Sequence, residues 1–167
     1  MAVTVEDGSI VTGADSYVSR ADYITYAASL GVTVADDEDA DAELVEASQF
    51  IDSFERSMVG KKTGRDQPMA FPRYDVVIED YYWDSDEIPR HVELCQMAYA
   101  LQIHQGVDIF NPEPIKTAKR ERVEGAIEVE YFGQDSGVKL SRNSRAEALL
   151  HSFLVNQGLY SITAVRA

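Results

Sequence analysis

The sequence has few of the residues that mark exported or membrane proteins. It contains one cysteine, Cys95, so no disulfide can form within the chain. No apolar run approaches the roughly 20 residues that a membrane-spanning helix requires. Residues 1–10 carry Glu6 and Asp7 but no lysine or arginine, so they lack the basic start of a secretory signal. We expect synthesis in a reducing cytoplasm and no membrane partner.

Basic residues are also scarce, with 15 lysines and arginines against 29 acids and a formal net charge of −14. The charge is segregated: residues 1–55 hold thirteen acids and one base, residues 56–73 five bases and one acid, and residues 74–95 seven acids and one base. Binding to nucleic-acid phosphates needs a basic face, which argues against a free-standing nucleic-acid binder. The surplus of acid favours solubility, and it also suits a surface that DNA slides past without binding.

Length and composition predict a folded chain of ordinary domain size. The apolar share is 45%, which is enough for a packed core, and 167 residues fit one domain. We therefore expect a single domain over residues 1–167. The predicted fold class is mainly α: a small helical bundle of about four helices, with a β-hairpin and extended arms at residues 1–15 and 159–167.

Capping residues predict the starts of three helices. Ser19 followed by Asp22 resembles a capping box and predicts a short first helix. Pro89 suits the first turn of a helix, and Ser144 can cap a last helix that ends at Gly158. The helix after Pro89 is apolar over a wide arc, which indicates the central position in the bundle.

An apolar stripe at helical spacing predicts another helix, from Asp39 or Asp41 to just before Gly60. The acids at its start suit the positive helix N-terminus. The members of the stripe are Leu44, Ala47, Ile51, Phe54 and Met58.

Two other segments have non-helical patterns. Residues 60–88 show no sustained periodicity, so we expect a long irregular segment that is functional or packs on itself. Residues 116–132 predict a β-hairpin that turns at Glu124 and Gly125, because apolar residues alternate with glutamates in its second half.

No constellation of residues predicts catalysis. The aspartates between Asp37 and Asp41 match the start of a calcium loop, but the glycine and glutamate that the loop requires are absent. Residues 60–63 lack the spacing of a phosphate-binding loop. His91 and Cys95 lie one helical turn apart, yet two ligands do not make a metal site. We expect no catalytic residue, no cofactor and no metal, and therefore no enzyme.

Several segments form an ordered set along the chain: Ala14-Asp-Ser-Tyr-Val-Ser19, Gly60-Lys-Lys-Thr-Gly-Arg-Asp-Gln-Pro-Met-Ala-Phe-Pro-Arg73, Ile88-Pro89, the basic-to-acidic run 119–131, and Val165-Arg-Ala167. In this order they resemble the head–tail connector (adaptor) proteins of tailed bacteriophages. The second matches the pattern Gly-x-x-Thr-x-x-x-Gln-x-Leu-x-Trp-Pro-Arg of that family, with Met69 for leucine and Phe71 for tryptophan. Some members of the family carry a label that likens them to primosomal single-stranded-DNA-binding proteins.

The resemblance implies a structural role at the junction of head and tail. Such a protein forms a ring, expected here to be a dodecamer, through which DNA passes without specific binding. The implied partners are the portal protein, a tail-side connector or tail terminator protein, and other copies of the chain. The implied location is the virion, after synthesis in the host cytoplasm.

Three sets of residues are the candidate contacts. A ring needs a heterologous interface, so we expect the basic patch Lys61, Lys62 and Arg65 to meet the acidic first and second helices of a neighbour. Gln67, Phe71, Pro72 and Arg73 are expected to pack the loop, with Arg73 free to pair with an acid. The tail is expected to contact the portal or a neighbour, because its apolar residues must dock on something. The tail residues are Leu159, Tyr160, Ile162, Val165 and Arg166.

The alternative is a nucleic-acid-binding accessory protein. In that case Lys61, Lys62 and Arg65 would track the phosphates, and the aromatics of residues 71–83 would stack on the bases of a single strand.

Overall fold

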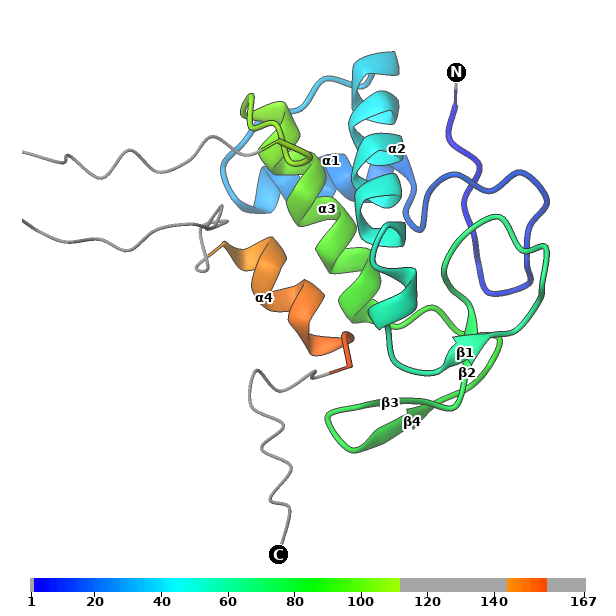
Figure 1. Ribbon diagram of the computed structural model, residues 1–167. Helices are drawn as coiled ribbons and strands as arrows, with labels where there is room; N and C mark the ends of the chain where they lie inside the picture. Colours follow the sequence, from blue (N-terminus) through cyan, green and yellow to red (C-terminus); the bar gives the residue numbers. More distant parts are fainter. Residues whose placement is uncertain (1, 112–143, 156–167) are drawn as a thin grey trace, which may run out of the picture.

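The computed structural model describes residues 2–111 and 144–155, and it confirms the mainly helical class with small β-hairpins (Figure 1). The predicted hairpin at residues 116–132 and the tail at 159–167 lie outside the described residues. Within the described part, no helix is both long and apolar enough to cross a membrane. The helices are α1 (Arg20–Ser29), α2 (Glu38–Asp52), α3 (Arg90–His104) and α4 (Arg145–Ser152), with the short 3-10 helix η1 (Glu55–Ser57).

Side-chain caps begin three of the helices. Ser19 accepts a hydrogen bond from the Asp22 amide and donates one to its carboxylate at 2.6 Å, which confirms the predicted start of α1. Ser144 caps α4 through the Glu147 amide, also as predicted. In α2 the cap is Asp37, so this helix begins slightly earlier than its apolar stripe indicated.

The predicted end of α2 is wrong. The helix stops at Asp52, and the chain continues through η1 instead of running on toward Gly60. Met58 is buried not by a helical stripe but by an antiparallel bridge to Leu154, beyond α4. A contact between residues so far apart leaves no local pattern in the sequence. Met58 continues the apolar spacing of α2, but it lies outside the helix. α4 likewise ends at Ser152, before the expected stop at Gly158.

Helix α3 is central, as its wide apolar arc predicted. It packs against α2, α4 and α1 (Figure 1). One polar side chain, Gln96, lies fully buried in the middle of it. Its amide nitrogen donates to the Ser16 hydroxyl at 2.8 Å and to the Leu44 carbonyl at 2.9 Å, and its oxygen accepts from the Tyr17 amide at 2.9 Å. Gln96 therefore ties α3 to α2 and to the N-terminal segment.

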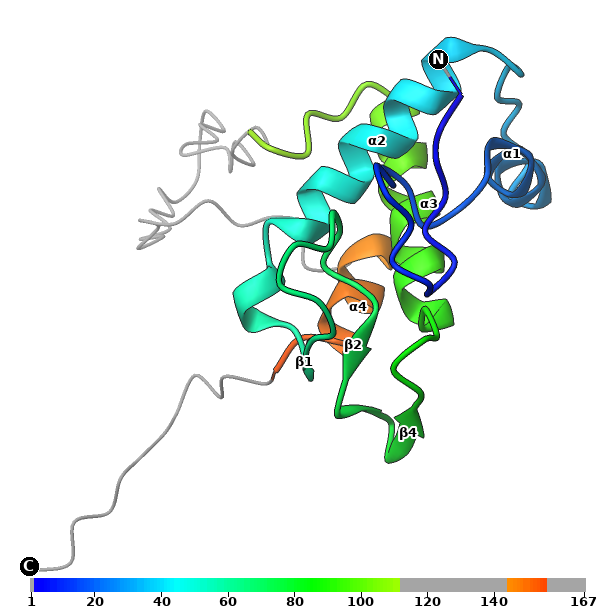
Figure 2. The ribbon, with the colours of Figure 1, turned by 90° about the vertical axis from the view of Figure 1, so that its right-hand side faces the viewer.

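The N-terminal segment, expected as an extended arm, folds back onto the helices (Figure 2). The buried carboxylate of Glu6 accepts hydrogen bonds from the amides of Gly8, Ile10 and Val11 at 2.9–3.0 Å, which closes a loop. Gly8 has φ +103° and lies against the backbone of Asp86, where a Cβ atom would come within 1.8 Å of the carbonyl oxygen. The loop is thus locked to the segment that precedes α3.

Residues 60–88, expected to be irregular, contain two short antiparallel hairpins. One pairs β1 (Lys61–Lys62) with β2 (Arg73–Tyr74), and the other pairs β3 (Val76–Ile78) with β4 (Tyr81–Trp83). The residues that connect β3 to β4, Glu79 and Asp80, both have positive φ, as a tight two-residue hairpin turn requires. Strands of two or three residues are too short to show a period of two in the sequence.

Candidate functional site

The segment 60–73 is held in shape from within by Gln67, which is buried. Its oxygen accepts from the Gly64 amide at 2.7 Å, and its nitrogen donates to the carbonyls of Met69 at 2.9 Å and Pro72 at 3.0 Å. The Phe71–Pro72 peptide bond is cis. One glutamine side chain therefore fixes both limbs of the loop.

Tyr17 and Asp52 anchor the same loop to the helical core. The Tyr17 hydroxyl donates to the Asp52 carboxylate at 2.5 Å and accepts from the amides of Ala70 and Phe71 at 3.1 and 3.2 Å. The second Asp52 oxygen accepts from the Ala70 amide at 3.1 Å. Burial and the neighbouring Asp52 charge raise the pKa of Tyr17, so the hydroxyl keeps its proton.

The apolar and basic ends of the loop face inward. Met69 and Phe71 are buried, with the Phe71 ring edge-on to the rings of Tyr17 and Phe153 at centroid distances of 6.5 and 6.0 Å. Pro72 is fully buried. Arg73 was expected to pair with an acid, but its guanidinium donates instead to three backbone carbonyls, those of Val59, Gly60 and Ala70.

Asp52 makes the stability of this anchor depend on pH. Burial outweighs the hydrogen bonds from Tyr17 and Ala70 and raises the pKa of the carboxyl from an ordinary 3.8 to about 6. The folded protein therefore holds a proton that the unfolded chain releases between about pH 4 and pH 6, and stability contributed by this group falls as pH rises through that window.

We predict that Asp52→Asn removes this dependence, which amounts to about 3 kcal/mol. Urea unfolding of both proteins between pH 4 and pH 7 measures it: the difference in unfolding free energy between wild type and variant should change most between pH 4 and pH 6. An NMR titration of the Asp52 carboxyl carbon with its midpoint near pH 4 would contradict the prediction.

The basic patch is small and partly engaged. The Lys62 ammonium lies 3.3 Å from the Glu55 carboxylate, and the Lys61 ammonium lies 5.7 Å from the centroid of the Tyr74 ring. The Arg65 side chain is 95% exposed and has Asp66 beside it. The structure brings the three bases into one loop, at the far end of α2 from its acidic start (Figure 1). The free positive charge that they present is therefore modest.

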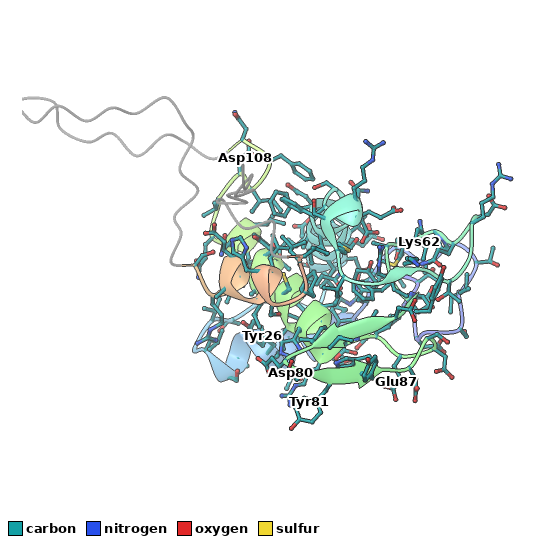
Figure 3. The ribbon with its side chains drawn as sticks, turned by 60° about the horizontal axis from the view of Figure 1, so that its bottom comes forward. Tyr26, Lys62, Asp80, Tyr81, Glu87 and Asp108 are labelled. Atoms are coloured by element: carbon teal, nitrogen blue, oxygen red, sulfur yellow. The ribbon has the colours of Figure 1, made fainter. Side chains whose placement is uncertain are left out.

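Four of the five aromatics of residues 71–83 divide into two groups, and the fifth, Tyr74, is 40% exposed with the Lys61 ammonium over its ring. Phe71 is buried and Trp83 half-buried, so neither offers a face for stacking. Tyr81 and Tyr82 are 74% and 86% exposed on β4, and Figure 3 shows Tyr81 projecting from the hairpin. Their nearest acidic neighbours in sequence, Asp80 and Asp84, are exposed as well. This surface would repel the phosphates of a nucleic acid whose bases stacked there.

A groove with a volume of about 870 Å³ lies between the N-terminal loop, α1, the start of α3 and the residues after β4. Figure 3 labels two of its lining residues, Tyr26 near α1 and Glu87 beyond β4. Apolar side chains line part of it: Val5, Val18, Trp83, Ile88, Leu94 and Met97. Six acids and one base, Arg90, complete the charged lining; the acids are Glu6, Asp7, Asp22, Asp86, Glu87 and Glu93. We call it the acid-rimmed groove.

The acids of the acid-rimmed groove are poorly neutralised. In the part of the chain that the structure describes, no lysine or arginine forms an ion pair with Asp86, Glu87 or Glu93. Burial and then the like charge of Asp22 raise the pKa of Glu93, and together they outweigh the opposite effect of the Arg90 charge. The groove therefore has a negative potential that favours a cationic occupant.

The thiol and histidine residues form no metal site. Cys95 is buried, donates weakly to the Ala146 carbonyl at 3.5 Å, and has its pKa raised by burial. His91 lies 3.9 Å from Glu79, and His104 2.8 Å from Glu43. Among residues 2–111 and 144–155, no group of three or more histidine, cysteine or acidic side chains could hold a metal ion.

A family model described as "Putative DnaT-like ssDNA binding protein" matches residues 1–167. No curated protein and no solved structure matches the chain.

Proposed function

The chain belongs to the DnaT-like family whose model spans it, and we propose that it is a structural head–tail adaptor subunit of a tailed bacteriophage. The proposal adds to the family membership a specific role: a ring of copies between the portal and the tail, through which DNA passes. Portal protein, a tail-side connector or terminator, and other copies would be its partners.

One observation carries the proposal. The residues by which the sequence resembles the connector proteins, Gln67, Phe71, Pro72 and Arg73, are all buried and bonded to the protein itself. A motif that served nucleic-acid binding would expose its aromatic and basic side chains. This one instead stabilises the shape of a strongly acidic subunit, as a conduit for DNA requires.

Electron microscopy of purified virions tests the proposal. We expect the chain to occupy a ring beneath the portal in the density. Virions that lack the chain, or that carry it away from the head–tail junction, would overturn the proposal.

The alternative, binding to single-stranded DNA, is favoured by the family description and by the exposed Tyr81 and Tyr82. We predict little retention of the protein on a single-stranded-DNA column at low salt, because the net charge is −14. The matched variant Lys61→Glu with Arg65→Glu should elute with the wild type. Tight, salt-sensitive retention that this variant loses would support the alternative.

We also predict that the isolated protein is monomeric or weakly associated. The basic patch has few free charges, since Lys62 already pairs with Glu55, and exposed ion pairs contribute little affinity. The portal protein would then serve as the template on which the subunits assemble into a ring. A stable closed ring at micromolar concentration and physiological salt, seen by light scattering, would contradict the prediction.

A further inference from the structure

We propose that the acid-rimmed groove binds the C-terminal segment, residues 156–167, of a second copy of this chain. The inference rests on the proposed ring, because it assigns one of the contacts between neighbouring copies. It names both sides of that contact: a groove on α1 and α3 of one copy, and the tail of the next.

Charge selects the tail as the occupant. The groove lining holds six acids and one base, so it disfavours an acidic segment. Residues 148–167 form the longest stretch of this acidic chain without an aspartate or glutamate, and they include Arg166. Arg166 would add a second positive charge to a lining in which Arg90 alone faces the six acids.

The order of side chains in the tail fits an apolar floor with an acidic rim. If the bound tail is extended, alternate residues share a face, and Tyr160, Ile162, Ala164 and Arg166 would lie on the same one. The first three are apolar or aromatic and would cover the floor, while the arginine would meet the rim. The floor offers them Trp83, Ile88, Leu94 and Met97.

Two polar atoms of the groove lining are short of partners. The Tyr26 hydroxyl and the Trp83 indole nitrogen are buried, and neither has a hydrogen-bond partner in the part of the chain that the structure describes. Both atoms are covered in this conformation, so the backbone of an extended peptide would reach them only where the Tyr26 and Trp83 side chains turn toward the groove.

The tail also starts far enough from its last anchor to reach another copy. Val155 donates its amide to the Ser57 carbonyl at 2.7 Å, and twelve residues follow it. Twelve extended residues span up to about 40 Å, which is about the width of a domain this size.

Photo-cross-linking of the full chain tests the contact. Tyr160 is replaced by benzoylphenylalanine, and isotope-labelled and unlabelled copies are mixed at high concentration, irradiated and digested for mass spectrometry. We expect cross-links between labelled and unlabelled copies on Leu94 or Met97, which line the floor of the groove. Cross-links confined within one copy, or between copies at other surfaces, would overturn the inference.

Charge-matched variants show whether the rim matters. Asp86→Lys with Glu87→Lys should lower the yield of cross-links between copies about tenfold, a change of about 1.4 kcal/mol. Asp80→Lys with Asp84→Lys makes the same change of charge at exposed residues outside the groove and should leave the yield unaltered. Adding Arg166→Glu to the groove variant should restore it. An unchanged yield in the groove variant contradicts the inference.

The outcome is separable from that of the proposed function. Whether the chain is present at the head–tail junction is determined by microscopy of wild-type virions, without reference to the groove. A chain located in the ring whose tail gives no cross-link to the groove of another copy would retain the proposed function and overturn this inference.

Discussion

Phe71→Ala should lower the free energy of unfolding by about 3–5 kcal/mol. The Phe71 side chain is fully buried, and its ring contacts those of Tyr17 and Phe153, which are themselves buried. The Arg73 guanidinium also lies 5.8 Å from the centroid of the Phe71 ring. Removing the ring would leave a cavity at the junction of the loop, the N-terminal segment and the residues after α4, because backbone hydrogen bonds hold all three in place. Urea unfolding at constant pH measures the effect.

Two control variants separate burial from aromatic character. Tyr82→Ala removes a ring that is 86% exposed and should change the unfolding free energy by less than about 0.5 kcal/mol. Phe71→Leu keeps most of the buried volume and should cost clearly less than Phe71→Ala. An alanine variant as stable as the wild type would mean that the segment 67–73 is a contact surface and not part of the core.

The helices were predictable where the signal is local. Ser19 and Ser144 cap their helices through side-chain bonds to residues three positions on, and such spacing is visible in the sequence. The end of α2 was not predictable, because Met58 is buried by Leu154, almost a hundred residues away. The hairpins of residues 60–88 have strands of two or three residues. Alternation of apolar and polar residues indicates a strand only when it runs over about four residues or more.

The polar anchors of the core were missed although the sequence carries a signal for them. Ser48 and Asp52 follow Leu44 at intervals of four, which places them on a buried helical face. Gln96 lies midway between Val92 and Ala100, which are both fully buried. A polar residue flanked by apolar residues at four-residue intervals on both sides indicates a buried hydrogen-bond centre. The partners of these residues come from distant segments and need the structure.

The acid-rimmed groove could not be anticipated from local patterns. Its rim combines Asp7, Asp22, Asp86 and Glu93, from three separated regions of the chain. Each acid alone resembles a solvated surface residue. The contact of Gly8 with the backbone of Asp86 brings the first and third regions together.

Deleting residues 159–167 should leave the protein folded and should abolish its incorporation into heads. The last anchors described after α4 are the Met58–Leu154 bridge and the bond from the Val155 amide to the Ser57 carbonyl, and the deletion leaves both intact. The core residue Phe153 also remains. The removed segment contains Leu159, Tyr160, Ile162 and Val165, apolar groups that we expect to dock on the portal or a neighbour.

A thermal melt paired with a virion-assembly complementation assay measures both parts of this prediction. The melting temperature of the truncated protein should lie close to that of the wild type, while no infectious particles form. The variant Tyr160→Ser with Ile162→Ser keeps the length of the tail but removes two of its apolar side chains. It should also fail to form infectious particles, because the apolar contacts and not the length of the tail are required. A much lower melting temperature would mean that the tail packs on its own copy, because only then does the monomer lose buried apolar area. Truncated protein that still assembles infectious particles would show that the contacts which build the ring lie elsewhere.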